Sequence, residues 1–311
     1  MDRIITPFGF ASTTAEVTAG IDLAGRRAIV TGGAAGIGKE TSRALAQIGA
    51  DVTLAVRNIE RAAPVVAEII NSTGNSNVRA ARLDLADRAI IAAFVAHWDG
   101  PLDLLVNNAG IMALPELEKT ADGFEMQFAT NHLGHFALAL GLHPALAVAG
   151  DARIVALSSS GHLFSPILFD DPHFNFVPYD PLVAYGQSKT ATALFAVEAT
   201  RRWAKDGIIA NAVMPGAIAT NLQRHTGGLR TPVEKRKSLE QGAATTLLAA
   251  VSPILKGVGG RYLEDCNEAQ TVDHRTADYS GVAPYALNPD NARRLWELSE
   301  GLLNSSAASA S

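Results

Sequence analysis

A chain of 311 residues, of which 48% are hydrophobic and 18% charged, is long enough to bury a large core within one α/β domain. The net charge of −5 argues against a nucleic-acid or an anionic-membrane partner, and the single cysteine, Cys266, excludes an internal disulfide and a multi-cysteine metal site. Low cysteine usage favours a cytoplasmic setting, and no stretch has the roughly 18 uninterrupted apolar residues of a membrane helix.

The chain divides into an arm, one domain and a tail. Residues 1–24 show neither a signal-peptide pattern nor a structural period, so we expect an N-terminal arm without a defined fold. Residues 25–303 are predicted to form a single domain. Residues 304–311 are small and polar, which predicts a flexible tail.

Short apolar runs alternate with helical patterns in the domain, for example the helical stretches Gly38–Ile48 and Tyr185–Ala204. This alternation is typical of a parallel sheet with helices on both faces. The predicted strands are Ala28–Thr31, Val52–Val56, Val78–Leu83, Leu102–Val106, Ile154–Leu157, Ile208–Val213 and Arg261–Leu263. We therefore predict an α/β fold with a single Rossmann-type, doubly wound parallel sheet of about seven strands.

A glycine-rich turn joins the first predicted strand to the first helix and includes Gly32, Gly36, Ile37 and Gly38. Glycines let the backbone approach a pyrophosphate closely, and the N-terminus of the helix offers free N–H groups to the anion. The spacing differs from the general dinucleotide fingerprint, Gly-x-Gly-x-x-Gly. A turn without a ligand is the alternative, but its position predicts a dinucleotide site.

The end of the second predicted strand indicates which dinucleotide binds. A carboxylate here would bond the ribose hydroxyls of NAD, but this chain has Arg57 and Asn58. Because Arg57 can pair with a 2′-phosphate, we predict NADP(H), with NAD(H) also possible. The alternative is that Arg57 is a solvated surface charge. Lys39 could add to the positive field, but a helix-surface position is preferred.

Four polar residues further along the chain suit hydride chemistry. Tyr185 and Lys189 stand four apart in a helical pattern, so they share one face. Ser159 follows a predicted strand at the sheet edge that binds ligands, and Asn131 lies in a helical stretch.

Hydride reduction of a carbonyl places negative charge on its oxygen, which must receive a proton. Tyr185 can exchange this proton once a nearby ammonium, here that of Lys189, favours the phenolate. The Ser159 hydroxyl can hold the substrate oxygen. Asn131 can hold a water or a backbone group behind Lys189.

Two segments are expected to line the substrate pocket. Residues 161–182 contain four prolines and four phenylalanines and form a long loop that favours an apolar substrate. We interpret His162 and His173 in this loop as pocket or surface residues, with no metal. Residues 221–239, called the lid segment below, are expected to form a solvated mobile lid with the cations Arg224, Arg230, Lys235, Arg236 and Lys237.

These motifs together resemble the short-chain dehydrogenase/reductase family over about residues 22–265. The family's catalytic tetrad is matched by Asn131, Ser159, Tyr185 and Lys189. The resemblance implies further cofactor contacts: Asp84 and Leu85 at the adenine, the Asn-Asn-Ala-Gly motif with Asn108, Ala109 and Gly110, and a segment over the nicotinamide carboxamide with Pro215, Gly216 and Thr220. It also implies a homo-oligomer, dimer or tetramer.

Within that family the chain is most similar to the retinol-dehydrogenase-like group, as in Asn131-His-Leu-Gly-His-Phe136. Ser159 and Tyr185 are 26 positions apart (185 − 159), wider than is usual in the family. Ser158 and Ser160 therefore stay open as alternatives to Ser159.

We predict an NADP(H)-dependent oxidoreductase that acts on a carbonyl or alcohol, which makes residues 25–303 a dinucleotide-binding catalytic domain. The first alternative is a non-catalytic, NADP-binding regulatory protein on the same fold, because fold alone does not give function. An epimerase or dehydratase of this fold is a third possibility.

Overall fold

The computed structural model describes residues 3–308, so the outermost residues of the predicted arm and tail, 1–2 and 309–311, lie outside the described residues. Eight strands form one sheet in the order β3-β2-β1-β4-β5-β6-β7-β8. The strands are β1 Arg27–Thr31, β2 Asp51–Val56, β3 Val78–Arg82, β4 Leu104–Asn107, β5 Ala152–Leu157, β6 Ile208–Met214, β7 Tyr262–Glu264 and β8 Asn267–Glu268. The order reverses beside β1, which is where open α/β sheets bind ligands.

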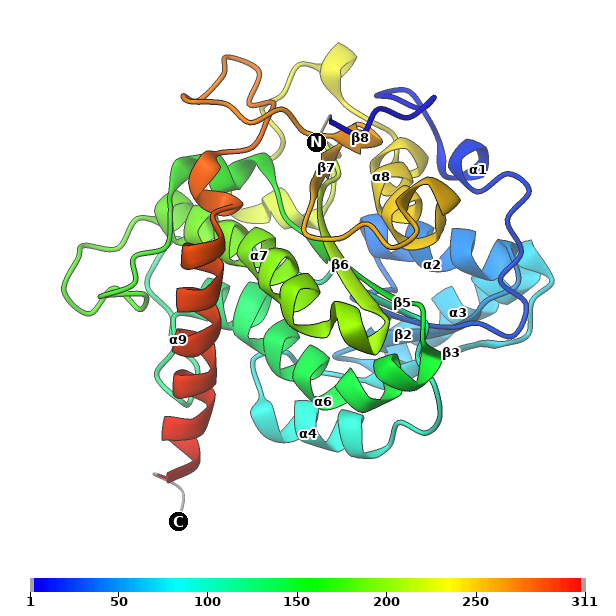
Figure 1. Ribbon diagram of the computed structural model, residues 1–311, viewed down its shortest axis with the longest axis horizontal. Coiled ribbons are helices and arrows are strands. Elements are labelled where there is room, and N and C mark those ends of the chain that lie inside the picture. Colours follow the sequence, from blue (N-terminus) through cyan, green and yellow to red (C-terminus); the bar gives the residue numbers. More distant parts are fainter. Residues whose placement is uncertain (1–2, 309–311) are drawn as a thin grey trace.

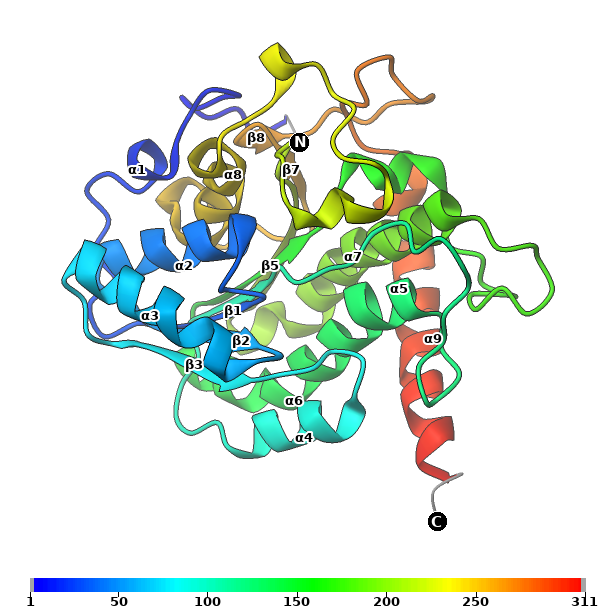
Figure 2. The ribbon, with the colours of Figure 1, turned by 180° about the vertical axis from the view of Figure 1, so that it is seen from behind.

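The α-helices cover both faces of the sheet, which confirms the predicted fold class (Figures 1 and 2). They are α1 Thr14–Val17, α2 Gly36–Gln47, α3 Ile59–Thr73, α4 Arg88–Ala96, α5 Met126–Phe128, α6 Gly134–Ala149, α7 Pro181–Trp203, α8 Leu239–Val251 and α9 Pro289–Ala308. Helices α2, α3 and α8 bury one apolar core against the sheet, and α4, α6 and α7 bury another on the opposite face. The buried strands are nearly all apolar, as a sheet covered on both faces requires.

The prediction of about seven strands missed β8, which pairs antiparallel with β7. This strand has two residues, so it has no readable period. It follows a tight turn at Asp265 and Cys266, both with positive φ, of 47° and 60°. The parallel part of the sheet has the seven predicted strands.

The N-terminal arm has a defined structure from residue 3 onward, contrary to expectation. The Ile4 N–H donates to the Glu268 carboxylate (2.9 Å), and the Glu268 N–H donates to the Ile4 carbonyl (3.0 Å). Helix α1 begins with a capping box between Thr13 and Glu16. At the other end, α9 continues to Ala308, beyond the expected start of the tail at residue 304. The arm is ordered by contacts with a distant part of the chain, the turn and strand at 266–268.

The helical stretch Met126–Ala149 is long and apolar enough, by length and composition, to cross a membrane. Half of its most apolar window is buried inside the protein. Phe136, Leu138 and Leu142 belong to the core against the sheet. Such a burial pattern is typical of a core helix.

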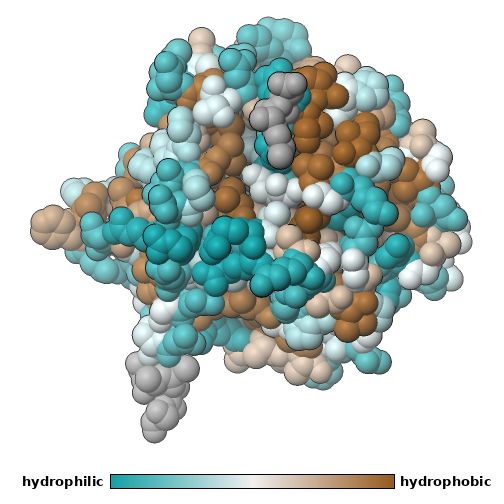
Figure 3. Space-filling model, in the orientation of Figure 1, coloured by the Kyte–Doolittle hydropathy of each residue, from teal (hydrophilic) through white to brown (hydrophobic). Residues whose placement is uncertain are grey.

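The long loop before α7 leaves the body of the protein (Figure 1, left). It starts with a 3₁₀ turn, Ser160–Phe164, and ends where Asp180 caps α7 at Pro181. Helix α7 thus begins four residues before the predicted Tyr185 because aspartate followed by proline is a helix start signal. The protruding tip is apolar (Figure 3), and Phe176 there is 92% exposed.

Candidate active site

One large cavity of about 1820 Å³ opens at the carboxyl ends of the strands. Most of the predicted site residues line it. These are Gly32, Gly36, Ile37, Gly38, Arg57, Asp84, Leu85, Asn108, Ala109, Gly110, Ser159, Tyr185, Lys189, Pro215, Gly216 and Thr220. The fold therefore brings site residues that are spread between positions 32 and 220 of the sequence to the wall of one cavity.

The glycine-rich turn leads into α2, whose N-terminus faces this cavity. The residue before α2, Ala35, makes no side-chain cap, and the first turn holds no acidic residue. Helices α3, α4, α7 and α8, by contrast, are capped by Asn58, Asp87, Asp180 and Ser238. The N–H groups at the start of α2 are therefore left for an anion.

Gly38 fixes how closely this helix approaches its neighbours. A Cβ atom at Gly38 would lie 2.4 Å from both the Asn108 Nδ2 and the Gly32 carbonyl oxygen. Asn108 in turn donates from Nδ2 to the Thr31 carbonyl (2.7 Å). The turn and the Asn-Asn-Ala-Gly motif thus form one tightly packed unit.

Arg57 and Asn58 follow β2 but have different positions. Arg57 is exposed and lines the cavity. Asn58 is not among the residues lining the cavity, and its Oδ1 accepts from the Arg61 N–H (2.8 Å) at the start of α3. Asp84, which lines the cavity, accepts from the Ala86 N–H (3.0 Å). Asn58 therefore acts as a helix cap. Lys39 pairs with Glu68 (2.7 Å) on the surface.

Tyr185 is buried at 3% exposure, deep in the cavity wall. Burial raises the pKa of Tyr185 to about 12, and a hydrogen bond with Ser159 acts in the opposite direction. The pKa thus lies above its ordinary value in the protein alone, although Lys189 was expected to lower it. Gly161 leaves space for the Tyr185 ring, because a Cβ at Gly161 would lie 2.6 Å from Tyr185 Cε1.

Of the three candidate serines, Ser159 shares the hydrogen bond with Tyr185. The Ser159 Oγ also accepts from the Gly161 N–H (3.0 Å). Ser158 is buried and donates instead to the Lys189 carbonyl (2.8 Å). Ser160 lines the cavity at the start of the 3₁₀ turn.

The Lys189 ammonium lies 5.7 Å from the centre of the Tyr185 ring. It donates to the Leu157 carbonyl at the end of β5 (2.8 Å). Burial lowers the pKa of Lys189 to about 8. A Cβ at Gly110 would lie 3.5 Å from the Lys189 Nζ, so the glycine leaves room for the ammonium.

Asn131 lies behind this pair in a π-helical turn, Ala129–Leu133, that joins α5 to α6. Its side chain accepts from the Ile111 N–H and donates to the Ile111 carbonyl, each at 2.9 Å. Its Nδ2 also donates to Ser188 Oγ (2.9 Å). Asn131 therefore holds the backbone after the Asn-Asn-Ala-Gly motif. Single π-turns inside helices often occur at functional sites.

Sequence reasoning missed a buried imidazole, His135, which joins two parts of the site. Its Nδ1 contacts the Asn131 carbonyl (3.0 Å) and its Nε2 contacts Thr31 Oγ1 (2.8 Å). Thr31 Oγ1 accepts from the N–H groups of Asn108 and Ala109, both at 2.9 Å. The spacing of four from Asn131 on one helix was the available signal.

Three expectations about the pocket were wrong. None of the residues 161–182 lines the cavity. The loop is bound instead to Gln187 of α7, and its tip leaves the body of the protein (Figure 1). His162 and His173 are buried: His162 contacts the Tyr262 hydroxyl (3.1 Å), and His173 accepts from the Glu125 N–H (3.3 Å). Burial lowers the pKa of each to about 4, so neither is a solvated surface group.

The lid segment does line the cavity, with residues from 221 to 239 (yellow in Figure 2). It includes the 3₁₀ turn Asn221–His225, which Thr220 caps. Lys237 was expected to be solvated, but its side chain is 1% exposed and pairs with Asp265 (2.5 Å). Within residues 3–308, His, Cys, Asp and Glu form no group of three that could hold a metal ion.

The chain matches the sequence model of the short chain dehydrogenase family over residues 26–228. A protein of Streptomyces lividans described as a probable oxidoreductase is 54% identical over 290 residues, covering 89% of this chain and 97% of the other. Retinol dehydrogenase 12 of Mus musculus is 37% identical and covers 92% of this chain and 89% of its own.

Solved structures give the same result. An uncharacterized protein from Mycobacterium Paratuberculosis has a TM-score of 0.75 at 32% identity, over 94% of this chain and 98% of the other. A Beutenbergia cavernae protein assigned as an NAD(P) dependent gluconate 5-dehydrogenase, with bound NADP, has a TM-score of 0.63 at 27% identity, over 78% and 96%. The chain belongs to the short-chain dehydrogenase/reductase family and is an oxidoreductase of that family.

Proposed function

We propose that this protein is an NADP(H)-dependent oxidoreductase that transfers a hydride between the nicotinamide and an apolar carbonyl or alcohol. The observation that carries the proposal is the shared cavity. The same cavity is lined by the uncapped N-terminus of α2 and by Tyr185, Ser159 and Lys189. The first suits a dinucleotide phosphate, and the second suits proton transfer at a carbonyl oxygen.

The cofactor fits the residues present. Gly32, Gly36 and Gly38 border the cavity at the start of α2, where an anion meets free N–H groups. Arg57 at the end of β2 supports NADP(H) over NAD(H), since its guanidinium can pair with a 2′-phosphate. Asp84 and Leu85 would contact the adenine, and Pro215, Gly216 and Thr220 would lie over the nicotinamide. The bound cofactor would supply or accept the hydride.

In the proposed mechanism Tyr185 gives its proton to the substrate oxygen during reduction. Its raised pKa, about 12, keeps the hydroxyl protonated at neutral pH, so the proton is present when hydride transfer places negative charge on the substrate oxygen. Ser159, bonded to Tyr185, holds the same substrate oxygen and stabilises its developing charge. The Lys189 ammonium stabilises the phenolate left behind, and Asn131 fixes the backbone at Ile111 beside it.

The substrate side of the cavity supports an apolar molecule of considerable size. Ligand sites usually measure about 300–1,000 Å³, so a cavity of about 1820 Å³ leaves space beside a dinucleotide. Apolar side chains outside the proposed cofactor contacts line this space, namely Met112, Leu114, Met126 and Leu229. Several charged residues share the lining, among them Glu118, Arg224, Arg230, Glu234 and Lys235.

The proposal includes a cytoplasmic protein that acts without a membrane or nucleic acid and assembles as a dimer or tetramer. The negative net charge and the single, buried Cys266 support the first part. The family resemblance supports the second. Light scattering on purified protein measures the assembly directly, and a mass equal to one chain contradicts it.

The test is transfer of deuterium from [4-²H]NADPH to a panel of apolar aldehydes and ketones. We expect label on the carbinol carbon of the product and oxidation of one NADPH per alcohol formed. Tight NADPH binding without transfer to any carbonyl, and without NADP⁺ reduction by the matching alcohols, would favour the non-catalytic NADP-binding protein instead.

A further inference from the structure

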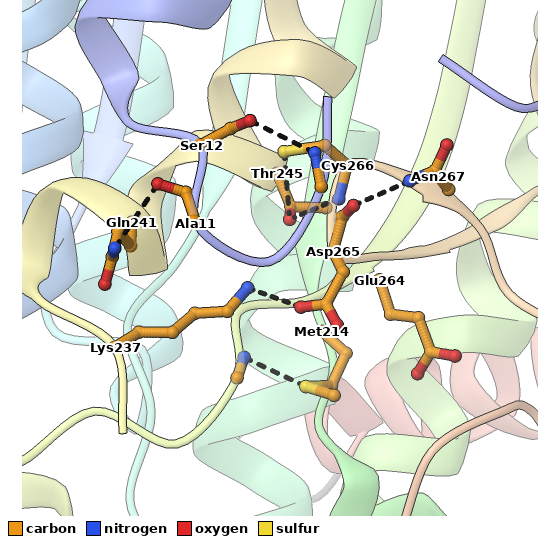
Figure 4. A network of polar contacts seen from close by, with 12 residues as sticks. Ala11, Ser12, Met214, Lys237, Gln241, Thr245, Glu264, Asp265, Cys266 and Asn267 are labelled. Carbon is orange, nitrogen blue, oxygen red and sulfur yellow. Dashed lines mark hydrogen bonds and ion pairs between the residues drawn. The ribbon is translucent and has the colours of Figure 1, made fainter. Parts of the chain in front are cut away.

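Lys237 differs from every other residue of the lid segment. It is the only buried residue between 221 and 240, with 1% of its side chain exposed. Its Nζ pairs with Asp265 Oδ1 at 2.5 Å (Figure 4). The neighbouring Glu264 carboxylate points away from it and accepts from the Gly281 N–H. A buried ammonium is costly without such a partner, so the pair fixes the end of the lid.

The stem of Lys237 lies directly on Gly216. A Cβ at Gly216 would be 2.8 Å from Lys237 Cδ and 3.0 Å from Cε. The Lys237 N–H also donates to the Ala217 carbonyl (2.9 Å). Gly216 itself has φ +100°, and its N–H donates to Met214 Sδ (2.9 Å). Lys237 thus packs against the backbone that borders the cavity after β6.

The partners of Lys237 come from both ends of the chain. Asp265 is in the β7–β8 turn, and the Phe10 ring of the N-terminal arm lies 5.0 Å from the Lys237 Nζ. The arm is tied to the same turn, because Asn267 Nδ2 donates to the Phe8 carbonyl (2.9 Å). Phe10, Lys237 and Asp265 all line the cavity. They also lie outside residues 26–228, which match the family.

We propose that Lys237, held by Asp265 and Phe10, is a positioning residue that presses the Gly216 backbone toward the bound cofactor. This inference rests on the proposed function for the identity of the cofactor. Loss of the ion pair frees the lid segment and the 214–217 backbone together, so cofactor affinity falls while the proton-transfer residues stay in place.

Two variants test the proposal. Asp265→Asn keeps a side chain that tolerates the positive φ of 47° but removes the charge. Lys237→Met keeps the stem on Gly216 and removes the ammonium. The matched control is Glu68→Gln, which breaks the exposed pair with Lys39 (2.7 Å).

We expect Asp265→Asn and Lys237→Met to raise the NADPH dissociation constant about tenfold. The KM for NADPH should rise with it, while kcat changes less than about twofold. Glu68→Gln should change neither quantity. An unchanged dissociation constant in both charge-removing variants overturns the proposal.

Trypsin gives a second measurement that needs no turnover. Arg224, Arg230 and Arg236 are cleavage sites inside the lid segment. Without cofactor, Asp265→Asn should be cut there about tenfold faster than the wild type, since local opening becomes easier. Equal cleavage rates overturn the positioning role even if the protein binds no NADPH. Failure of NADPH binding in the wild type, by contrast, counts against the proposed function.

Discussion

His135 connects the Asn131 turn to the strand that carries the glycine-rich turn. Burial lowers the pKa of His135 to about 4, so the ring is neutral near pH 7. Because Nδ1 donates to the Asn131 carbonyl, Nε2 must accept from the Thr31 hydroxyl. Thr31 then offers its lone pairs to the Asn108 and Ala109 N–H groups. A single tautomer of His135 therefore holds both the Asn131 turn and, through Thr31, the backbone of the Asn-Asn-Ala-Gly motif.

Replacement of His135 by Asn removes the contact with Thr31, since the shorter side chain cannot reach it. We expect a loss of about tenfold in kcat/KM, and a similar loss in Thr31→Val. Thr31→Ser keeps the hydroxyl and should stay near wild-type activity. Steady-state kinetics on one accepted carbonyl measures this, and wild-type rates in both disruptive variants refute the linkage.

Arg57 decides the cofactor in the proposed function. Arg57→Asp places a carboxylate where the 2′-phosphate would lie, so the KM for NADPH should rise at least about tenfold more than the KM for NADH. Arg82→Asp is the matched control, because Arg82 is an exposed arginine near the end of β3 that does not line the cavity. Equal changes for the two cofactors in Arg57→Asp contradict the role.

At the scale of elements, close packing between α2 and the motif after β4 shapes the cofactor side. Gly38→Ala drives a methyl group into Asn108 and Gly32, 2.4 Å from each. We expect a loss of about 2 kcal/mol in unfolding free energy and a marked loss of NADPH affinity. Gly301→Ala in α9 meets nothing within 4 Å and should stabilise by up to about 1 kcal/mol. Urea unfolding separates the two outcomes.

The parts that could be predicted from sequence are those with a period or a motif. Seven parallel strands, the glycine-rich turn and the positions of Ser159, Tyr185 and Lys189 follow from local pattern. Strand β8 has only two residues, too few for a readable period. The arm depends on contacts between residues about 260 apart, such as Thr6 with Cys266. No local pattern records such pairing.

The same limit explains the errors at the site. The 161–182 loop is rich in phenylalanine, which favoured a pocket wall. Its apolar side chains are instead buried in the protein or exposed at the tip of the loop. Lys237 looks like its solvated neighbours in sequence. Its burial is set by Asp265, 28 residues away, and by Phe10 from the arm. Whether a charged side chain is buried depends on the residues that it contacts in the fold, and these contacts cannot be read from the local sequence.

At the scale of the whole molecule, four buried histidines make stability depend on pH. Burial lowers the pKa of His132 to about 3 and those of His135, His162 and His173 to about 4. The unfolded chain therefore binds more protons between about pH 4 and 6.5. Their stabilisation is complete above about pH 6.5 and is lost as the pH falls toward 4.

Glu125 acts in the opposite direction, since burial raises its pKa to about 7 and its stabilisation is lost as the pH rises through that value. The histidines outnumber it, so the free energy of unfolding should fall by about 3 kcal/mol between pH 7 and pH 5. Urea titrations at these pH values measure the change. A constant or rising stability toward pH 5 contradicts neutral buried imidazoles.

The central claim is that Tyr185 exchanges the proton in a hydride transfer. Its most direct test is kcat with NADPH and one accepted carbonyl for Tyr185→Phe, with Tyr285→Phe as the control. The Tyr285 hydroxyl donates to the His162 carbonyl (2.7 Å) and does not line the cavity. We predict a loss of at least about 10³-fold for Tyr185→Phe with NADPH affinity retained, and little change for Tyr285→Phe. Turnover by Tyr185→Phe at the wild-type rate would contradict the account.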